Sequence, residues 1–182
     1  MKYLPLLYRL NAEERYLIWI SNEQDAVAVD HEGFFPSFRD LVNLRRYADL
    51  NHYRLESEEP VLHDLDWVAM LKMAMNPEID CENALAAWNL FSDVAVSTPS
   101  HGNAFQTLDS KAHWPIYDKL FRGNNLPALN PKGERYIPEW SQDEIRSLAK
   151  LLTSGLDLFV SSIRTWPREL SETGPAPNPL LN

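Results

Sequence analysis

A single cysteine and two of the histidines are the side chains of this chain that best suit nucleophilic or acid–base chemistry. Cys81 follows Asp80 at the start of a predicted helix, where the helix dipole lowers the pKa of a thiol. Its two neighbours, Asp80 and Glu82, are negative and raise that pKa instead. We therefore interpret Cys81 as a structural residue of the first helical turn. A small enzyme that uses Cys81, or His101 with His113 as an acid–base pair, stays as an alternative.

Metal and phosphate chemistry have weaker support. The segment His63–Asp66 (HDLD) brings three polar ligand types together, but carboxylates at a helix N-terminus explain it better. The phosphate-binding, nucleophile-elbow and zinc-protease motifs are all missing, and six glycines offer little for a phosphate loop. We predict no catalytic residue, no metal and no cofactor.

The composition narrows the function classes further. The chain has 182 residues, a formal charge of −9 and a pI near 5.0, which argues against direct nucleic-acid binding. One cysteine allows no internal disulfide and is typical of a reducing compartment. The N-terminus is interrupted too soon by Pro5 and Arg9 for a signal peptide, and no apolar run has the ~18 residues of a membrane span. We expect a cytoplasmic protein with no membrane contact.

The first sixty residues have the pattern of a small α+β unit. Asn11–Glu14 is expected to join two strands as a hairpin loop. A helix capped by Ser37 follows, and then a short return strand at 53–56. Three antiparallel strands are expected in a meander, at residues 4–10, 16–20 and 26–29.

Residues 61–166 change to a helical period, and 167–182 form a proline-rich tail that we expect to be flexible. Asp64 or Asp66 is expected to cap one helix and Asp80 the next. The sequence Ser141-Gln-Asp-Glu144 predicts a capping box for a long helix that runs to about Thr165. Gly155 within that helix indicates close packing against a neighbour. The predicted fold class is α+β: a small antiparallel sheet with one helix, followed by a mainly helical half, in one compact body.

The net charge of the chain is concentrated in one segment. Residues 56–93 hold nine acids and one base, Lys72, so they carry −8 of the total −9. One interpretation is a solvated face with two helix N-caps. The other is an acidic surface for a cationic partner, whose approach it would accelerate.

Four stretches of the chain resemble the immunity proteins of bacterial contact-dependent growth inhibition systems. The likeness spans roughly residues 3–160. It consists of the order of these stretches and their general residue pattern, and no single motif in it is highly specific. The stretches are the opening hairpins through Val29, Leu62–Trp67 (LHDLDW), Ala87–Ala95 (AWNLFSDVA), and the block from Ile116–Phe121 (IYDKLF) through Gly123–Pro127, Gly133-Glu134 and Trp140-Ser141 to the final helix.

The resemblance implies a non-enzymatic protein that binds a cognate toxin C-terminal domain in the cytoplasm and occludes its active site. Many such toxins are nucleases with basic clefts, so we expect a basic nuclease partner. An adaptor for a non-toxin protein is a further alternative. The predicted toxin-binding residues are Glu56, Glu58, Glu59, Asp64, Asp66, Glu78, Asp80 and Glu82, with His101 and Asn103 from the long polar loop at 97–111.

Overall fold

A six-stranded sheet forms the centre of the fold, and its strands come from both ends of the sequence. The computed structural model describes residues 1–57, 59–71, 78–99, 105, 111–128, 133 and 135–167. The strand order is β5-β1-β2-β4-β6, with β3 also paired to β2. The strands are β1 (Lys2–Leu10), β2 (Glu13–Ser21), β3 (Ala26–Val27), β4 (Phe35–Phe38), β5 (Leu62–Asp64) and β6 (Ile163–Trp166).

The hairpin between β1 and β2 confirms the first part of the predicted meander, with a tighter turn than expected. Asn11 and Ala12 form it, with φ angles of 55° and 60°. Both residues are left-handed, as a two-residue turn between twisted strands requires, and this conformation is strained for alanine. The Asp66 carboxylate accepts both their backbone N–H groups, at 2.6 and 2.8 Å, and so holds the turn.

The predicted cap of the first helix was wrong. Helix α1 (Leu41–Leu50) begins after Asp40, whose side chain accepts the backbone N–H of Asn43 at 2.8 Å. Ser37 instead lies in β4, buried, with its hydroxyl 2.6 Å from the Tyr8 hydroxyl. Strand β4 pairs in parallel with β6, which lies more than 120 residues later in the sequence. Local sequence signals cannot reveal such a distant partner.

Two further predictions, of one strand and of the end of one helix, also need correction. The return strand expected at 53–56 is reduced to one parallel bridge, between Leu55 and Tyr3. The long helix was expected to reach Thr165, but α6 ends at Ser162 and the chain continues directly as β6. Both differences arise because pairing with the sheet decides these boundaries.

The helical half agrees more closely with the prediction. Asp80 caps α3, and both hydrogen bonds of the Ser141–Glu144 capping box are present at the start of α6. Within the described ranges, no helix is long and apolar enough to cross a membrane. The helices that the structure describes in full in this half are α2 (Leu65–Leu71), α3 (Cys81–Ser97), α5 (Trp114–Gly123) and α6 (Gln142–Ser162), with a short 3₁₀ turn η1 (Lys111–His113) before α5.

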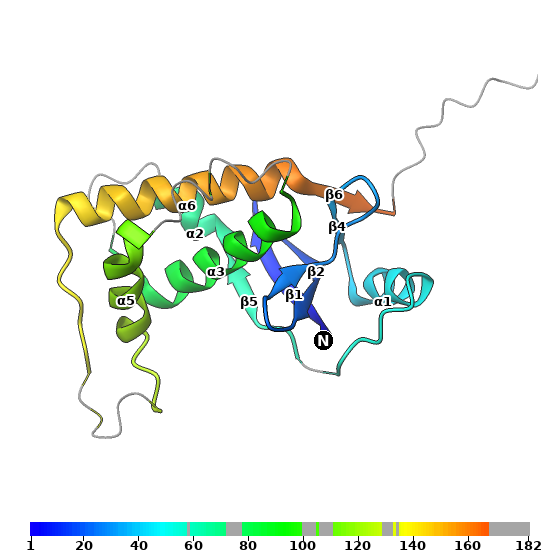
Figure 1. The fold of residues 1–182 in the computed structure, drawn as a ribbon, viewed down its shortest axis with the longest axis horizontal. Coiled ribbons are helices and arrows are strands. Elements are labelled where there is room, and N and C mark those ends of the chain that lie inside the picture. Colours follow the sequence, from blue (N-terminus) through cyan, green and yellow to red (C-terminus); the bar gives the residue numbers. More distant parts are fainter. Residues whose placement is uncertain are drawn as a thin grey trace, which may run out of the picture.

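Helix α6 lies along one side of the molecule, over α2 and α3, and carries the chain back into the sheet (Figure 1). Its Phe159 ring contacts three core aromatic rings: Tyr8 at 5.0 Å, Phe35 at 4.9 Å and Phe91 at 6.2 Å between centroids. The core therefore joins the sheet and the helices in one compact α+β body. Because β5 and β6 belong to residues 61–166, the expected boundary near residue 60 does not separate sheet from helices. Of the predicted tail, all but Pro167 lies outside the described residues.

The contact between α3 and α6 yields a test. A Cβ atom on Gly155 would lie 2.6 Å from Cγ and 2.8 Å from Cβ of Phe91. Alanine in place of glycine ordinarily stabilises a helix by about 1 kcal/mol. Here Gly155→Ala should instead lower the free energy of unfolding by about 1–3 kcal/mol, because the phenyl ring must move. Urea denaturation measures the change.

The neighbouring substitution Ser154→Ala, also within α6, is the control and should change the unfolding free energy by less than about 0.5 kcal/mol. A Gly155→Ala protein more stable than the wild type would contradict the close contact.

Candidate functional site

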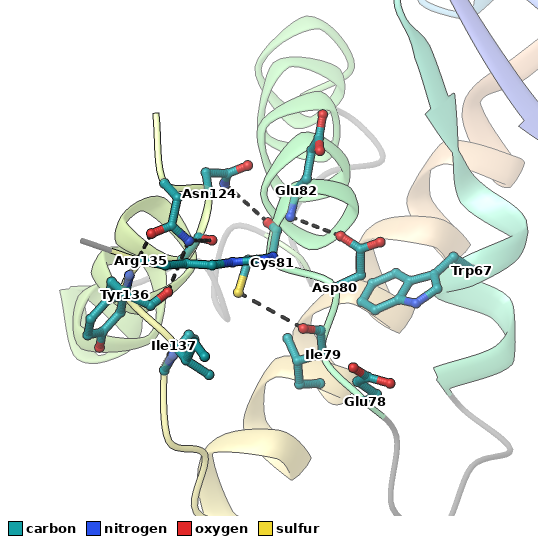
Figure 2. A pocket seen from close by; sticks show the side chains of 13 residues that line it. Trp67, Glu78, Ile79, Asp80, Cys81, Glu82, Asn124, Arg135, Tyr136 and Ile137 are labelled. Carbon is teal, nitrogen blue, oxygen red and sulfur yellow. Dashed lines mark hydrogen bonds between the residues drawn. The ribbon is translucent and has the colours of Figure 1, made fainter. Parts of the chain in front are cut away.

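A cleft of about 890 Å³ opens where the N-terminus of α3 meets the C-terminus of α5. It brings together three of the predicted binding residues, Glu78, Asp80 and Glu82. Figure 2 shows Asp80 and Trp67 on one side of it, and Asn124, Arg135 and Tyr136 on the other. The remaining lining residues are Ile79, Cys81, Gly123, Asn125, Ile137 and Pro138.

The start of α3 fixes the acidic side of the cleft. The Asp80 carboxylate accepts the backbone N–H groups of Glu82 and Asn83, both at 3.1 Å, and the Asn83 side-chain amide at 2.8 Å. Asp80 is therefore occupied as the helix N-cap. Glu78 and Glu82, which flank it, are exposed. These two carboxylates are the ones that the local fold leaves available to a partner.

Two asparagines and an arginine hold the opposite side. The Asn124 side chain donates to the Cys81 carbonyl at 3.3 Å. Asn125 has a φ of 52°. Its side-chain amide donates to the Tyr136 carbonyl at 3.0 Å, and its side-chain oxygen accepts the backbone N–H of Tyr136 at 2.6 Å. The Arg122 guanidinium stacks 4.6 Å from the centroid of the Tyr136 ring. The cleft wall is thus tied to both α3 and α5.

Cys81 lies at the base of the cleft with little access to it. Its side chain is 9% exposed, and its Sγ lies 4.0 Å from the Ile79 carbonyl oxygen. A Cβ atom on Gly123 would come within 2.5 Å of that sulfur, so the two chains are in close contact. Burial, and then the charge of Asp80, raise the pKa of the thiol. This environment disfavours the thiolate that nucleophilic catalysis requires.

Of the two histidines of the alternative site, the structure describes His113, which lies far from Cys81. His113 precedes α5, whereas Cys81 contacts Gly123 at its other end, about 15 Å away at 1.5 Å per residue. His101 lies outside the described residues. Across the part of the chain that the structure describes, no three His, Cys, Asp or Glu side chains are grouped so that they could hold a metal ion.

The other predicted acidic residues are dispersed. Asp64 forms an ion pair with Arg9 at 3.3 Å and accepts the backbone N–H of Asp66 at 3.1 Å, while Asp66 holds the β1–β2 turn. Glu56 lies beside Tyr3 of β1, whereas Asp64 pairs with Arg9 of the same strand. Because Tyr3 and Arg9 are six residues apart along β1, Glu56 lies about 20 Å from Asp64.

Glu59 is exposed, and Glu58, His101 and Asn103 lie outside the described residues. Of the described predicted binding residues, Glu78, Asp80 and Glu82 line one cleft, while Asp64 and Asp66 lie next to each other at the start of α2.

A second cavity, of about 470 Å³, lies further along α3 than the cleft. It is lined by residues of α3, β1, β2, β5 and α5 and by Asp25. The Asp93 carboxylate lines it and accepts the indole N–H of Trp19 at 2.9 Å. Tyr117 donates to Asn89 at 3.0 Å across the mouth. The other lining residues are Leu6, Asp25, His63, Ala86, Leu90 and Ser92.

Sequence reasoning counted Asp93 in the acidic segment but did not select it as a site residue. Its neighbours in the cavity come from residues 6 to 117, so only the tertiary fold brings them together. The sequence signals that could have indicated this site were the indole of Trp19, which can donate a hydrogen bond to a carboxylate, and the high density of acidic residues.

Burial controls the charge in this cavity. Desolvation raises the pKa of Asp93 to about 6, the Trp19 hydrogen bond opposes that rise, and the Asp25 carboxylate adds to it. Burial also lowers the pKa of His63, whose Nδ1 lies 3.2 Å from the Val61 carbonyl oxygen. At pH 7 the Asp93 carboxyl is therefore mostly ionised, and the lowered pKa of His63 favours its neutral imidazole. Among its described lining residues there is no lysine or arginine.

Comparisons with known proteins support the fold alone. No protein-family model matches the sequence, and no curated protein matches it either. Among solved structures, the fold is similar to the SatS C-terminal domain, in a crystal structure of its complex with bromine. The TM-score is 0.51, with 11% sequence identity, over 90% of this chain and 93% of that domain. At this identity the likeness extends to the arrangement of helices and strands.

The raised pKa of Asp93 predicts a pH dependence of stability. The native state binds a proton more tightly than the unfolded chain between pH 3.8 and about 6, so this carboxyl costs stability as the pH rises through that range. Asp93→Asn removes the titration and keeps an oxygen for Trp19. The free energy of unfolding of Asp93→Asn, relative to that of the wild type, should increase from pH 4 to pH 7 by roughly 1–2 kcal/mol. This is less than the full pKa shift implies, because the cavity is open to water.

Urea denaturation of both proteins at pH 4, 5, 6 and 7 measures this difference. Asp157→Asn, at an exposed position of α6, is the control and should give a difference that does not vary with pH. A constant difference for Asp93→Asn as well would contradict the assigned pKa.

Proposed function

We propose that this protein is a cytoplasmic immunity protein that binds the toxin domain of a bacterial contact-dependent growth inhibition system and covers its active site. The observation that carries the proposal is the cleft at the start of α3, where carboxylates and apolar side chains share one surface. Glu78 and Glu82 provide exposed negative charge, while Ile137, 76% exposed, and Trp67 provide apolar area on opposite sides of the cleft (Figure 2). The proposal also rests on the resemblance of four sequence stretches to that family.

Each part of the cleft has a role in this function. Carboxylates at its edge would attract the basic substrate cleft of a nuclease and raise the association rate. Apolar and aromatic side chains at the centre of an interface supply most of its binding free energy. A standard interface buries about 1,600 Å², and nanomolar binding corresponds to about −12 kcal/mol. Such a complex would occlude the toxin without any chemical step.

The proposal excludes a catalytic role for Cys81. Its buried thiol is packed against Gly123, which favours a structural role over an enzymatic one. Protection of growth is measured by co-expression with the cognate toxin domain, which is to be sought in the gene that adjoins this one upstream. A Cys81→Ala protein should protect cells as well as the wild type. Loss of protection by a variant that still folds and binds the toxin domain would support the enzyme alternative.

The two exposed carboxylates of the cleft provide the main test. The double variant Glu78→Lys, Glu82→Lys should slow association with the toxin domain about tenfold or more at low salt. The difference should shrink as salt rises, since the screening length falls from ~10 Å at 0.1 M to ~3 Å at 1 M. Stopped-flow mixing measures the association rates.

A matched control changes the net charge equally at two exposed positions away from the cleft: Asp49→Lys in α1 with Asp157→Lys in α6. Equal slowing by both double variants would mean that net charge alone steers the encounter, and would remove the cleft as the binding site.

A further inference from the structure

One face of α3 connects the acidic cleft with the Asp93 cavity. Glu82, Ala86, Asn89 and Asp93 follow one another at intervals of four, three and four residues, which places them in one stripe along a helix. Glu82 lines the cleft, and the other three line the cavity. The stripe is about 16 Å long at 1.5 Å per residue. One bound protein is wide enough to cover both hollows, because a standard interface buries about 800 Å² on each partner.

The cavity has the chemistry of a site for an organic cation. Asp93 and Asp25 contribute two carboxylates, and Trp19 and Tyr117 contribute aromatic rings. The Trp19 indole donates to one oxygen of Asp93, Oδ2, at 2.9 Å. Within the described residues, Oδ1 receives no hydrogen bond. Asp93 is half-buried, and the cost of its partial desolvation is reduced when a cation pairs with it, so a cation placed here would recover free energy that the unbound protein lacks.

A guanidinium group fits these surroundings better than a metal ion. The cavity offers two carboxylates from different elements, and the third titratable group, His63, faces a backbone carbonyl through its Nδ1. Arginine can pair with a carboxylate through two N–H groups and stack on an aromatic ring. Its long side chain also reaches a charge that lies below the surface.

The surface next to the cavity suits the flanking residues of a partner protein. An apolar groove of about 570 Å³ adjoins the cavity through Asn89, Ser92 and Tyr117. Trp114, 63% exposed, and Phe121, 37% exposed, line its outer side. A buried charge pair beside exposed aromatic rings is the composition found at the centre of tight protein interfaces.

We propose that the cavity between Asp93 and Asp25 receives an arginine side chain of the bound toxin domain, while Glu78 and Glu82 contact the same partner at the start of α3. This inference rests on the proposed function and adds a specificity pocket to it. The cleft carboxylates steer the encounter, and the Asp93 pocket then holds the complex together.

The decisive experiment measures binding of the toxin domain to the wild type, to Asp93→Asn and to the control Asp157→Asn. Removing one member of a buried charge pair should raise Kd at least about thirty-fold, mainly through faster dissociation. Asp157→Asn should leave Kd unchanged. An Asp93→Asn protein that is folded and binds as tightly as the wild type would overturn the inference and leave the proposed function standing.

A second measurement addresses the pocket without the toxin. N-acetyl-arginine amide, its neutral analogue N-acetyl-citrulline amide and the small amine agmatine are titrated separately into the whole protein. The NMR signal of the Trp19 indole N–H, which donates to Asp93, reports on occupancy. The arginine probe should shift this signal saturably in the wild type, about tenfold more weakly in Asp93→Asn, and the citrulline probe should not.

The two measurements separate the possible failures. If the wild type does not bind the toxin domain, the proposed function is wrong, and with it the partner named here. If the toxin domain binds regardless of Asp93 while agmatine binds with micromolar affinity, the pocket serves a free amine and the inference is overturned. If the arginine and citrulline probes shift the Trp19 signal equally, the pocket does not select a cation, and the inference is overturned as well.

Discussion

The packing of α3 against α6 is the constraint on which the rest of the structure depends. The Phe91 side chain occupies the space that Gly155 leaves open, and its ring lies 6.2 Å from that of Phe159. Phe159 in turn contacts the sheet through Tyr8 and Phe35. This contact fixes the rotation of α3 about its axis. It therefore decides which stripe of the helix faces outward and lines the two hollows.

Carboxylates have two separate roles in this protein. Asp66 holds a strained turn and Asp80 caps a helix, so their charge is compensated by backbone N–H groups. Glu78 and Glu82 remain exposed, and Asp93 is half-buried in a cavity that Asp25 also lines. A high density of acids in the sequence is consequently not one binding face. The residues proposed to bind include Glu78 and Glu82, which the fold leaves exposed, and Asp93, which uses one of its two carboxylate oxygens to hold Trp19.

Predictions from the sequence were correct where the interacting residues are close together in the chain, and they failed where those residues are far apart. Local signals identified the β1–β2 hairpin, the Asp80 cap and the Ser141 capping box, because each needs only neighbouring residues. Ser37 was misassigned because the pairing of β4 with β6 spans most of the chain. The same distinction applies to the site: the trio at residues 78–82 is local, whereas Asp93 meets Trp19 only through the tertiary fold.

In the proposed complex, one partner covers the outward stripe of α3 and places an arginine beside Asp93. The most direct measurement is a crystal structure of the complex with the toxin domain. It should show a guanidinium within about 4 Å of the Asp93 carboxylate and the toxin surface over Glu82 and Asn89. A complex in which this stripe of α3 stays exposed to solvent would contradict the central claim.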